Sequence, residues 1–255
     1  MNAFLLLKKV LLNLIFYPSF VLVTVLLPAM AFLPMLLCRF TLGYRKTLYL
    51  FRILILWYGF IVVRVLPFPF VRIQDQEFDR KPVLGACVFV CNHRSSSDAF
   101  LMESLDRELV QVVNTWPFKI PVIGMLGRLA GYLNVRSMPF QEFLATGCGL
   151  LSDGVSVVAF PEGARSTDGR VGQFHGAIFR VAQAARVPIV PICLSGNQDI
   201  PPKGSWLLSP GIVKMHRLPA LEWSFYGDLS PFELKNRVRA LIQAELDRLE
   251  RSVVN

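Results

Sequence analysis

The sequence of 255 residues has few cysteines and few histidines. Its five cysteines are scattered without a C-x-x-C pair, so they indicate neither a disulfide framework nor a zinc site, and they fit a reducing compartment. The three histidines form no H-E-x-x-H pattern, which argues against metal-dependent hydrolysis. Internal repeats and low-complexity tracts are also missing, so nothing in the sequence divides the chain into similar units.

Charged residues are scarce as well, at 18% against 53% hydrophobic residues, which is more apolar than is usual for a soluble domain. The charge is also unbalanced, because 27 Lys and Arg against 18 Asp and Glu give a net charge of +9. This excess favours an anionic partner such as nucleic acid, a phospholipid headgroup or a phosphorylated substrate. No basic stripe interleaved with aromatic residues occurs outside the apolar N-terminal region, so we expect no nucleic acid partner.

The excess of apolar residues lies at the start of the chain. No residue from Val10 to Cys38 is charged, and this stretch exceeds the roughly 20 residues that a helix needs to cross a bilayer. Pro18, Pro28 and Pro34 would kink or break a straight helix, so a re-entrant hairpin and a single tilted span are both open. The sequence therefore predicts a stretch that lies in a membrane.

A second apolar stretch, residues 47–70, carries Arg52 and Arg64. The segment between the two arginines is too short to span a bilayer but suits the membrane interface, with the arginine side chains reaching into water. For the first stretch, a cleaved signal peptide is less favoured because the apolar run is longer than that of a signal peptide. A fully buried core helix is less favoured because soluble folds seldom cover so long a helix on all sides. We predict that residues 1–70 form a helical membrane-anchoring segment, with the catalytic domain on the cytoplasmic side of the membrane (the inner membrane in a bacterium).

After Val71, short β-branched or apolar runs alternate with helix-like stretches, a pattern typical of α/β folds. The expected strands are VLGACVFV, LVQVVN, YLNV, VSVVAF, IVPICL, IVKMH and LEWSFY. A capping box with proline at the first helical position, Ser230–Glu233, predicts a closing helix. We therefore predict that residues 71–255 form an α/β catalytic domain, with a central mixed sheet flanked by helices.

The stretch VFVCNHRSSSDAFL, residues 88–101, carries the first candidate site. The run VFV predicts a buried strand and the serines predict a helix start, so His93 stands at a strand-to-helix junction with Asp98 near enough to reach its ring. The carboxylate would accept from Nδ1 and leave Nε2 free to act as a base. The alternative is a structural histidine, with Asp98 an ordinary acid at a helix start.

The proton acceptor needs a substrate group to act on. Serine catalysis is the weaker choice, because the chain contains no G-x-S-x-G pattern. The base could instead take a proton from a hydroxyl of the substrate, so that the substrate oxygen itself attacks an activated acyl group.

The stretch VSVVAFPEGARSTDG, residues 155–169, carries the second candidate site. A buried strand is followed by the polar loop from Glu162 to Ser166. Gly163 would let the backbone approach an oxyanion, and Arg165 offers a planar fork that grips phosphate through two hydrogen bonds. The alternative is a plain turn in which Glu162 and Arg165 pair with each other.

Together these stretches resemble the glycerolipid acyltransferases, the family of 1-acylglycerol-3-phosphate acyltransferases. NHRSSSD resembles the family's N-H-x-x-x-x-D motif, and FPEGARS resembles its F-P-E-G-T-R-S motif. The stretch from Lys119 to Arg136 resembles the block between these motifs, and Val187–Pro191 resembles the last block. Four blocks in the right order over residues 83–194 are a specific signal, whereas each alone would be weak.

The resemblance implies transfer of a fatty acyl chain from acyl-CoA or acyl carrier protein to the free hydroxyl of lysophosphatidic acid, giving phosphatidic acid in phospholipid biosynthesis. His93 would be the base and Asp98 would orient it. The residues expected to bind the acceptor phosphate are Glu162, Gly163, Arg165, Ser166, Lys119 and Arg136. The expected partners are membrane lipids, a lysophospholipid acceptor and a thioester donor. Neither a metal, a cofactor nor a covalent acyl-enzyme is expected.

Two positions depart from the family pattern. Ala164 stands where threonine is common, which removes one hydroxyl from the phosphate loop. Phe174-His175-Gly176 stands where Phe-Lys-x-Gly is common. The acceptor is therefore less well defined than the reaction, and another lysolipid, such as a lyso-ornithine lipid or a different lysophospholipid, stays open.

Overall fold

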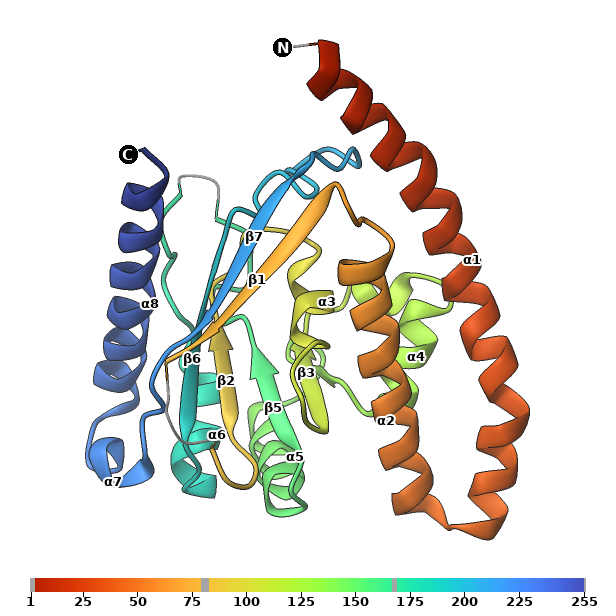
Figure 1. Ribbon diagram of the computed structural model, residues 1–255. Helices are drawn as coiled ribbons and strands as arrows, with labels where there is room; N and C mark the ends of the chain where they lie inside the picture. The colour runs from red at the N-terminus through yellow and green to blue at the C-terminus, as the bar shows by residue number, and fades with distance from the viewer. Residues whose placement is uncertain (1–2, 79–82, 167–168, 255) are drawn as a thin grey trace.

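A mixed β-sheet forms the centre of the protein (Figure 1). The computed structural model describes residues 3–78, 83–166 and 169–254, and within them the sheet has seven strands in the order β1-β7-β6-β2-β5-β3-β4. The strands are β1 (Val71–Glu77), β2 (Val88–Cys91), β3 (Leu109–Val113), β4 (Leu133–Asn134), β5 (Ser156–Ala159), β6 (Ile189–Ser195) and β7 (Gly211–Arg217). The predicted α/β fold with a central mixed sheet is confirmed.

The direction of the strands decides where a site can form. Neighbouring strands are parallel from β6 through β2, β5 and β3 to β4, whereas β7 runs antiparallel to β6 and parallel to β1. The carboxyl ends of β6, β2, β5, β3 and β4 therefore share one edge of the sheet. In open α/β sheets ligands bind outside this edge, and both predicted motifs follow strands that end there.

Helices cover both faces of the sheet (Figure 1). After β1 the helices are α3 (Asp98–Met102), the short 3₁₀-helix η2 (Pro117–Lys119), α4 (Ile123–Ala130), α5 (Phe140–Ser152), α6 (Ala177–Ala185), α7 (Trp223–Tyr226) and α8 (Pro231–Val254). Helix α8 begins at the predicted capping box, where the Glu233 N–H donates to Ser230 Oγ and the Ser230 N–H donates to the Glu233 carboxylate.

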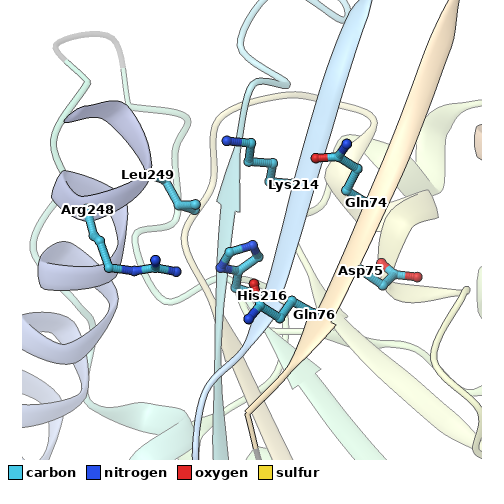
Figure 2. Close-up of a pocket in the computed structure, with 7 residues that line it drawn as sticks. All are labelled: Gln74, Asp75, Gln76, Lys214, His216, Arg248 and Leu249. Atoms are coloured by element: carbon cyan, nitrogen blue, oxygen red, sulfur yellow. The ribbon is translucent and has the colours of Figure 1, made fainter. Parts of the chain in front are cut away.

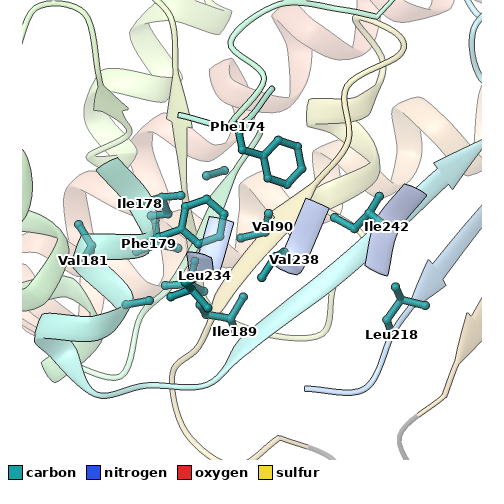
Figure 3. Close-up of a cluster of buried hydrophobic side chains, with 14 of the residues drawn as sticks. Val90, Phe174, Ile178, Phe179, Val181, Ile189, Leu218, Leu234, Val238 and Ile242 are labelled. Atoms are coloured by element: carbon teal, nitrogen blue, oxygen red, sulfur yellow. The ribbon is translucent and has the colours of Figure 1, made fainter. Parts of the chain in front are cut away.

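The main hydrophobic core lies between the sheet and the helices α5, α6 and α8 (Figure 3). Phe179 of α6, Ile189 of β6 and Val238 of α8 are each fully buried in it. The inner strands β2, β5 and β6 are buried along their whole length, as expected for parallel strands covered on both faces. These packed strands give the loops at their ends a rigid base.

The N-terminal region forms two long helices beside the sheet (Figure 1). Helix α1 (Ala3–Thr41) is continuous through its three prolines and curves along its length, so the first apolar stretch is one helix rather than a broken hairpin. Helix α2 (Tyr44–Phe60) follows after a short turn and continues into the π-helical turn η1 (Ile61–Val65). By length and composition, residues 3–41 and residues 44–65 could each cross a membrane.

The environment of Arg52 differs from the sequence-based expectation. Its side chain is 4% exposed, with Nε donating to the Ala130 carbonyl at 2.9 Å and Nη1 donating to Glu108 at 2.8 Å. Arg45 binds the same carboxylate at 2.7 Å. The prediction that Arg52 reaches into water is wrong, because α2 packs on the α/β domain and a buried guanidinium requires a counter-charge.

Two strand assignments also change. The stretch LEWSFY contains the short helix α7, and Leu221 alone pairs with Ile189 across an isolated bridge. Short apolar runs fit a helix and a strand equally well, and this run was misjudged for that reason. Strand β1 was missed because VRIQDQE is polar and lies at the sheet edge. The proposed division at residue 70 falls just before β1 and stays a prediction.

Candidate active site

The carboxyl edge of the sheet gathers the loops that carry the predicted residues. His93 follows β2, and the loop from Glu162 to Ser166 follows β5, the neighbour of β2. The Ser166 N–H donates to the His93 carbonyl at 2.9 Å, which holds the two loops together. The two motifs are therefore in direct contact.

The predicted pairing of His93 with Asp98 is confirmed. His93 Nδ1 lies 2.8 Å from Asp98 Oδ2, and the side chain of Asp98 is fully buried while that of His93 is 23% exposed. The ring is thus held from inside the protein and can be reached from outside. With Nδ1 donating to the carboxylate, Nε2 is left as the nitrogen that can accept a proton.

Asp98 is fixed by further donors. The N–H groups of Arg94 and Ser95 donate to Oδ2 at 2.7 and 2.9 Å, and Asn197 Nδ2 donates to Oδ1. Asp98 is also the first residue of α3, where the helix dipole favours a negative charge. These interactions hold the carboxylate in one orientation toward the His93 ring.

Two asparagines near the dyad were not singled out from the sequence. Asn92 bridges β2 to β6, because its Nδ2 donates to the Leu194 carbonyl at 2.9 Å and its Oδ1 accepts the Leu194 N–H at 2.7 Å. Asn197 follows β6 and contacts Asp98 from the other side. Asn92 belongs to the N-H-x-x-x-x-D motif, which was the available signal, whereas no local pattern marked Asn197.

Glu162 connects the phosphate-loop candidate to the dyad. Its Oε1 accepts the His93 N–H at 2.7 Å, and its Oε2 accepts the Gly172 N–H at 2.8 Å. Burial raises the pKa of Glu162 above its ordinary value, although the hydrogen bonds from the two N–H groups oppose this shift. The turn in which Glu162 pairs with Arg165 is therefore not the arrangement found, and both Glu162 oxygens serve the backbone.

The next residue of the loop, Gly163, has a backbone conformation that favours glycine. This residue has a φ of +68°, and a Cβ on it would lie 3.4 Å from the His175 imidazole. The His175 N–H donates to the Pro161 carbonyl at 2.8 Å, so its ring is placed against the loop. Arg165 is half-buried, and in the described part of the chain its side chain makes no hydrogen bond or ion pair. Its guanidinium is thus available to an anion.

Lys119 and Arg136 lie on the same sheet edge but farther from the dyad. Lys119 ends η2 after β3, and Arg136 follows β4; both are exposed and neither forms an ion pair within the residues that the structure describes. With strands about 4.8 Å apart, their strands lie about 10 and about 14 Å from β2. The structure does not bring these two side chains into contact with His93.

A hollow of about 260 Å³ lies elsewhere, between β1, β7 and α8 (Figure 2). Its lining residues are Gln74, Asp75, Gln76, Lys214, His216, Arg248 and Leu249. His216 Nδ1 is 2.5 Å from Glu245, which also binds Arg248 at 2.7 Å, so this second histidine is held in a structural pair. Across the described residues, no group of His, Cys, Asp and Glu side chains is arranged to hold a metal.

Comparison with known proteins places this geometry in a family. Residues 71–195 match the family model described as Acyltransferase. The 1-acyl-sn-glycerol-3-phosphate acyltransferase BAT2 of Brassica napus is 34% identical over 67% of this chain and 51% of its own length. The 1-acyl-sn-glycerol-3-phosphate acyltransferase of Salmonella typhimurium is 28% identical over 68% of this chain and 74% of its own length.

The chain spans about half the length of two chloroplastic relatives, 51% of the one from Brassica napus and 43% of the one from Arabidopsis thaliana. Its fold is shared with the crystal structure of the 1-acyl-sn-glycerophosphate (LPA) acyltransferase PlsC from Thermotoga maritima, with a TM-score of 0.77 at 23% identity over 96% of this chain and 97% of that one. The family model and these relatives place residues 71–195, the part of the chain that carries both motifs, in the acyltransferase family.

Proposed function

We propose that this protein transfers a fatty acyl chain from a thioester donor to the free hydroxyl of lysophosphatidic acid, giving phosphatidic acid. The observation that carries the proposal is the buried carboxylate of Asp98, 2.8 Å from a reachable His93 imidazole. Beside them lies a loop whose Arg165 side chain has no partner among the residues that the structure describes. The relatives from Brassica napus and Salmonella typhimurium, both named as 1-acyl-sn-glycerol-3-phosphate acyltransferases, support this acceptor.

The reaction follows from the two ends of the imidazole. His93 Nε2 takes the proton of the acceptor hydroxyl, and the oxygen forms a bond to the thioester carbonyl carbon. The tetrahedral intermediate then expels the donor as a thiolate, and the imidazolium gives its proton to this thiolate. The Asp98 carboxylate accepts from Nδ1 and stabilises the imidazolium. A positioned base of this kind contributes about 100- to 10,000-fold in rate.

The oxyanion of the intermediate needs donors that are not already in use. The N–H groups of His93, Arg94 and Ser95 donate to carboxylates, and that of Gly163 donates to the Phe160 carbonyl. We assign the oxyanion to the next N–H groups of the loop, at residues 164 and 165, which have no protein acceptor in the described structure.

The acceptor phosphate is assigned to Arg165, with weaker support from Lys119 and Arg136 because of their distance along the sheet edge. Glu162 acts by positioning the loop against His93, since an ionised carboxylate only accepts hydrogen bonds and would repel a phosphate. Gly163 and Ser166 bring the backbone of the loop close to the bound group. The two apolar helices would hold this edge at a membrane, on its cytoplasmic side, where lysolipid and thioester meet.

A different lysolipid is the second candidate acceptor. His175 stands beside Gly163 where the family commonly carries a lysine, and Ala164 lacks the common hydroxyl. A headgroup such as that of a lyso-ornithine lipid would need less positive charge at this loop.

One assay separates these possibilities. Purified protein is given acyl-CoA or acyl carrier protein as donor and a panel of lysolipids as acceptor, and thiol release is followed with His93→Ala as the control. We expect release to require lysophosphatidic acid and His93. Release without any acceptor would mean a thioesterase, and full activity of His93→Ala would remove the base from the mechanism.

A further inference from the structure

The segment after β6 connects the candidate site to helix α1. At its start, Asn197 donates to Asp98, and the Ile200 carbonyl accepts from Ser95 Oγ at 2.6 Å and from Ser97 Oγ at 2.7 Å. The buried side chain of Ile200 anchors this end in the core. The segment therefore begins in contact with the loop that carries the dyad.

The far end of the same segment is bound to α1. Asn13 of α1 makes two hydrogen bonds to the backbone of Leu208, from Nδ2 to the carbonyl at 2.8 Å and from the N–H to Oδ1 at 2.9 Å. The Tyr17 hydroxyl donates to the Trp206 carbonyl. Leu208 is 4% exposed, so this end also packs into the core, and Figure 1 shows the loop between β6 and β7 reaching α1.

Between these two attachments the segment presents apolar side chains to the outside. Trp206 is 80% exposed and Leu207 is 54% exposed. The turn that carries them is formed, since the Ser205 N–H donates to the Pro202 carbonyl at 3.1 Å and the Leu207 N–H donates to Ser205 Oγ at 3.0 Å. An ordered turn that exposes an indole beside a leucine marks an interaction surface.

We propose that Trp206 and Leu207 insert into the interfacial layer of an anionic bilayer, as a membrane contact separate from the apolar helices. The neighbouring part of α1 has the same character, with Val10 47% exposed and Leu14 65% exposed on either side of the attached Asn13. Tryptophan is enriched at the headgroup depth of membranes. The apolar surface of α1 therefore continues across this turn.

The charged side chains around the turn are basic, which favours a membrane with anionic lipids. Residues 201–210, PPKGSWLLSP, carry Lys203 as their single charged side chain, and it is exposed. Lys8, on the turn of α1 before the attachment, is exposed as well. Basic residues beside an inserted aromatic side chain are attracted to anionic headgroups.

The inference deepens the proposed function, on which it rests for the lipid substrate. Because the same segment contacts Asp98 at one end and the bilayer at the other, the dyad would lie one loop away from the headgroup layer. A lysolipid acceptor could then present its hydroxyl to His93 with its acyl chain still in the leaflet.

Tryptophan fluorescence tests the insertion without any enzyme activity. A full-length variant with Trp57, Trp116 and Trp223 changed to Phe keeps Trp206 as its emitter. It is mixed with phosphatidylglycerol vesicles that contain lipids brominated on the acyl chain. We expect a blue shift and strong quenching of Trp206. The proposal is overturned by unshifted, unquenched emission, or by a shift with acyl carrier protein in place of vesicles.

The matched control keeps Trp223 and changes the other three tryptophans to Phe. Trp223 begins α7, close to Leu221, which pairs with Ile189 at the first residue of β6. Trp206 lies in the segment that leaves the other end of β6, after Ser195. The two tryptophans thus lie at opposite ends of the strands of the sheet. Equal quenching of both would mean that the vesicles bind the protein without orientation, which contradicts insertion of this turn.

Kinetics give a second, independent readout. Trp206→Glu with Leu207→Glu should raise the apparent KM for lysophosphatidic acid in vesicles by about tenfold, because a charged side chain does not enter the interface. The kcat with a monomeric short-chain acceptor should not change. An unchanged vesicle KM would overturn the proposal. A wild-type protein inactive on every acceptor would refute the proposed function instead, and the fluorescence result would still decide the insertion.

Discussion

Replacing Asp98 with Asn should slow turnover while the protein stays folded. The imidazolium that forms on His93 during the reaction would lose its charged partner 2.8 Å away. A hydrogen bond to a charged group contributes about 1.5–3 kcal/mol, so we expect kcat to fall by about 10- to 150-fold. If the shape of the site is kept, the fall in kcat measures the loss of the Asp98 charge alone.

The surroundings of Asp98 indicate that the shape is kept. The new amide oxygen can accept from His93, Arg94 and Ser95, as Oδ2 does now. The new NH₂ group would face Asn197, whose Oδ1 is buried without a hydrogen-bond partner in the described structure. Rotation of the Asn197 amide would present that oxygen as an acceptor. The substitution therefore removes a charge without leaving a new buried donor unpaired.

Thiol release at saturating donor and acceptor measures the effect, with circular dichroism and thermal unfolding as checks of the fold. The control is Glu245→Gln, because Glu245 binds His216 at 2.5 Å in a second histidine–carboxylate pair outside the site. This control should lower the melting temperature and leave kcat unchanged. If Asp98→Asn keeps more than half of the wild-type kcat, or if the control loses as much activity, the role given to Asp98 is wrong.

Three further predictions follow from single contacts. Arg165→Ala should raise the KM for lysophosphatidic acid by about 10- to 100-fold and leave the KM for the donor unchanged, and equal effects in steady-state kinetics would exclude a phosphate role. Burial raises the pKa of Glu103 to about 7, so its ionisation costs stability as the pH rises from about 4.5 to about 7. Glu103→Gln should therefore stabilise the protein by about 3 kcal/mol at about pH 8 and by little at about pH 4, as measured by denaturant unfolding. Gly147→Ala should lower the melting temperature because its Cβ would lie 2.8 Å from Val181 Cγ1, whereas Gly149→Ala, with no atom within 4 Å, should stabilise by about 0.5–1 kcal/mol.

The dyad could be predicted from the sequence because it is local. His93 and Asp98 are five residues apart across a strand-to-helix junction, and an apolar run followed by serines marks such a junction. The contacts that fix the dyad are not local. Asn197 is 99 residues from Asp98, and Glu162 is 69 residues from His93. Sequence spacing says nothing about such pairs, so the contact between Glu162 and the His93 backbone could not be predicted.

The fold shows the same limit. Apolar runs predicted the buried strands and the long N-terminal helix, because the number of consecutive apolar residues indicates both the burial and the length of an element. Arg52 was misjudged because its partner Glu108 lies 56 residues along the chain. Pairing across the sheet, including the antiparallel register of Cys193 with His216, likewise depends on distant residues.

The buried Arg52 has a practical consequence for the preparation of a water-soluble form of this protein. Truncation at residue 70 would leave Glu108, whose side chain is 8% exposed, without its buried cation, and would strip Leu12 and Tyr58 from the cluster that they share with Phe89. Such a fragment would be expected to aggregate. Substituting exposed side chains of α1, such as Leu14 and Leu33, with polar residues would keep its buried face intact. This is the better route to a detergent-free preparation.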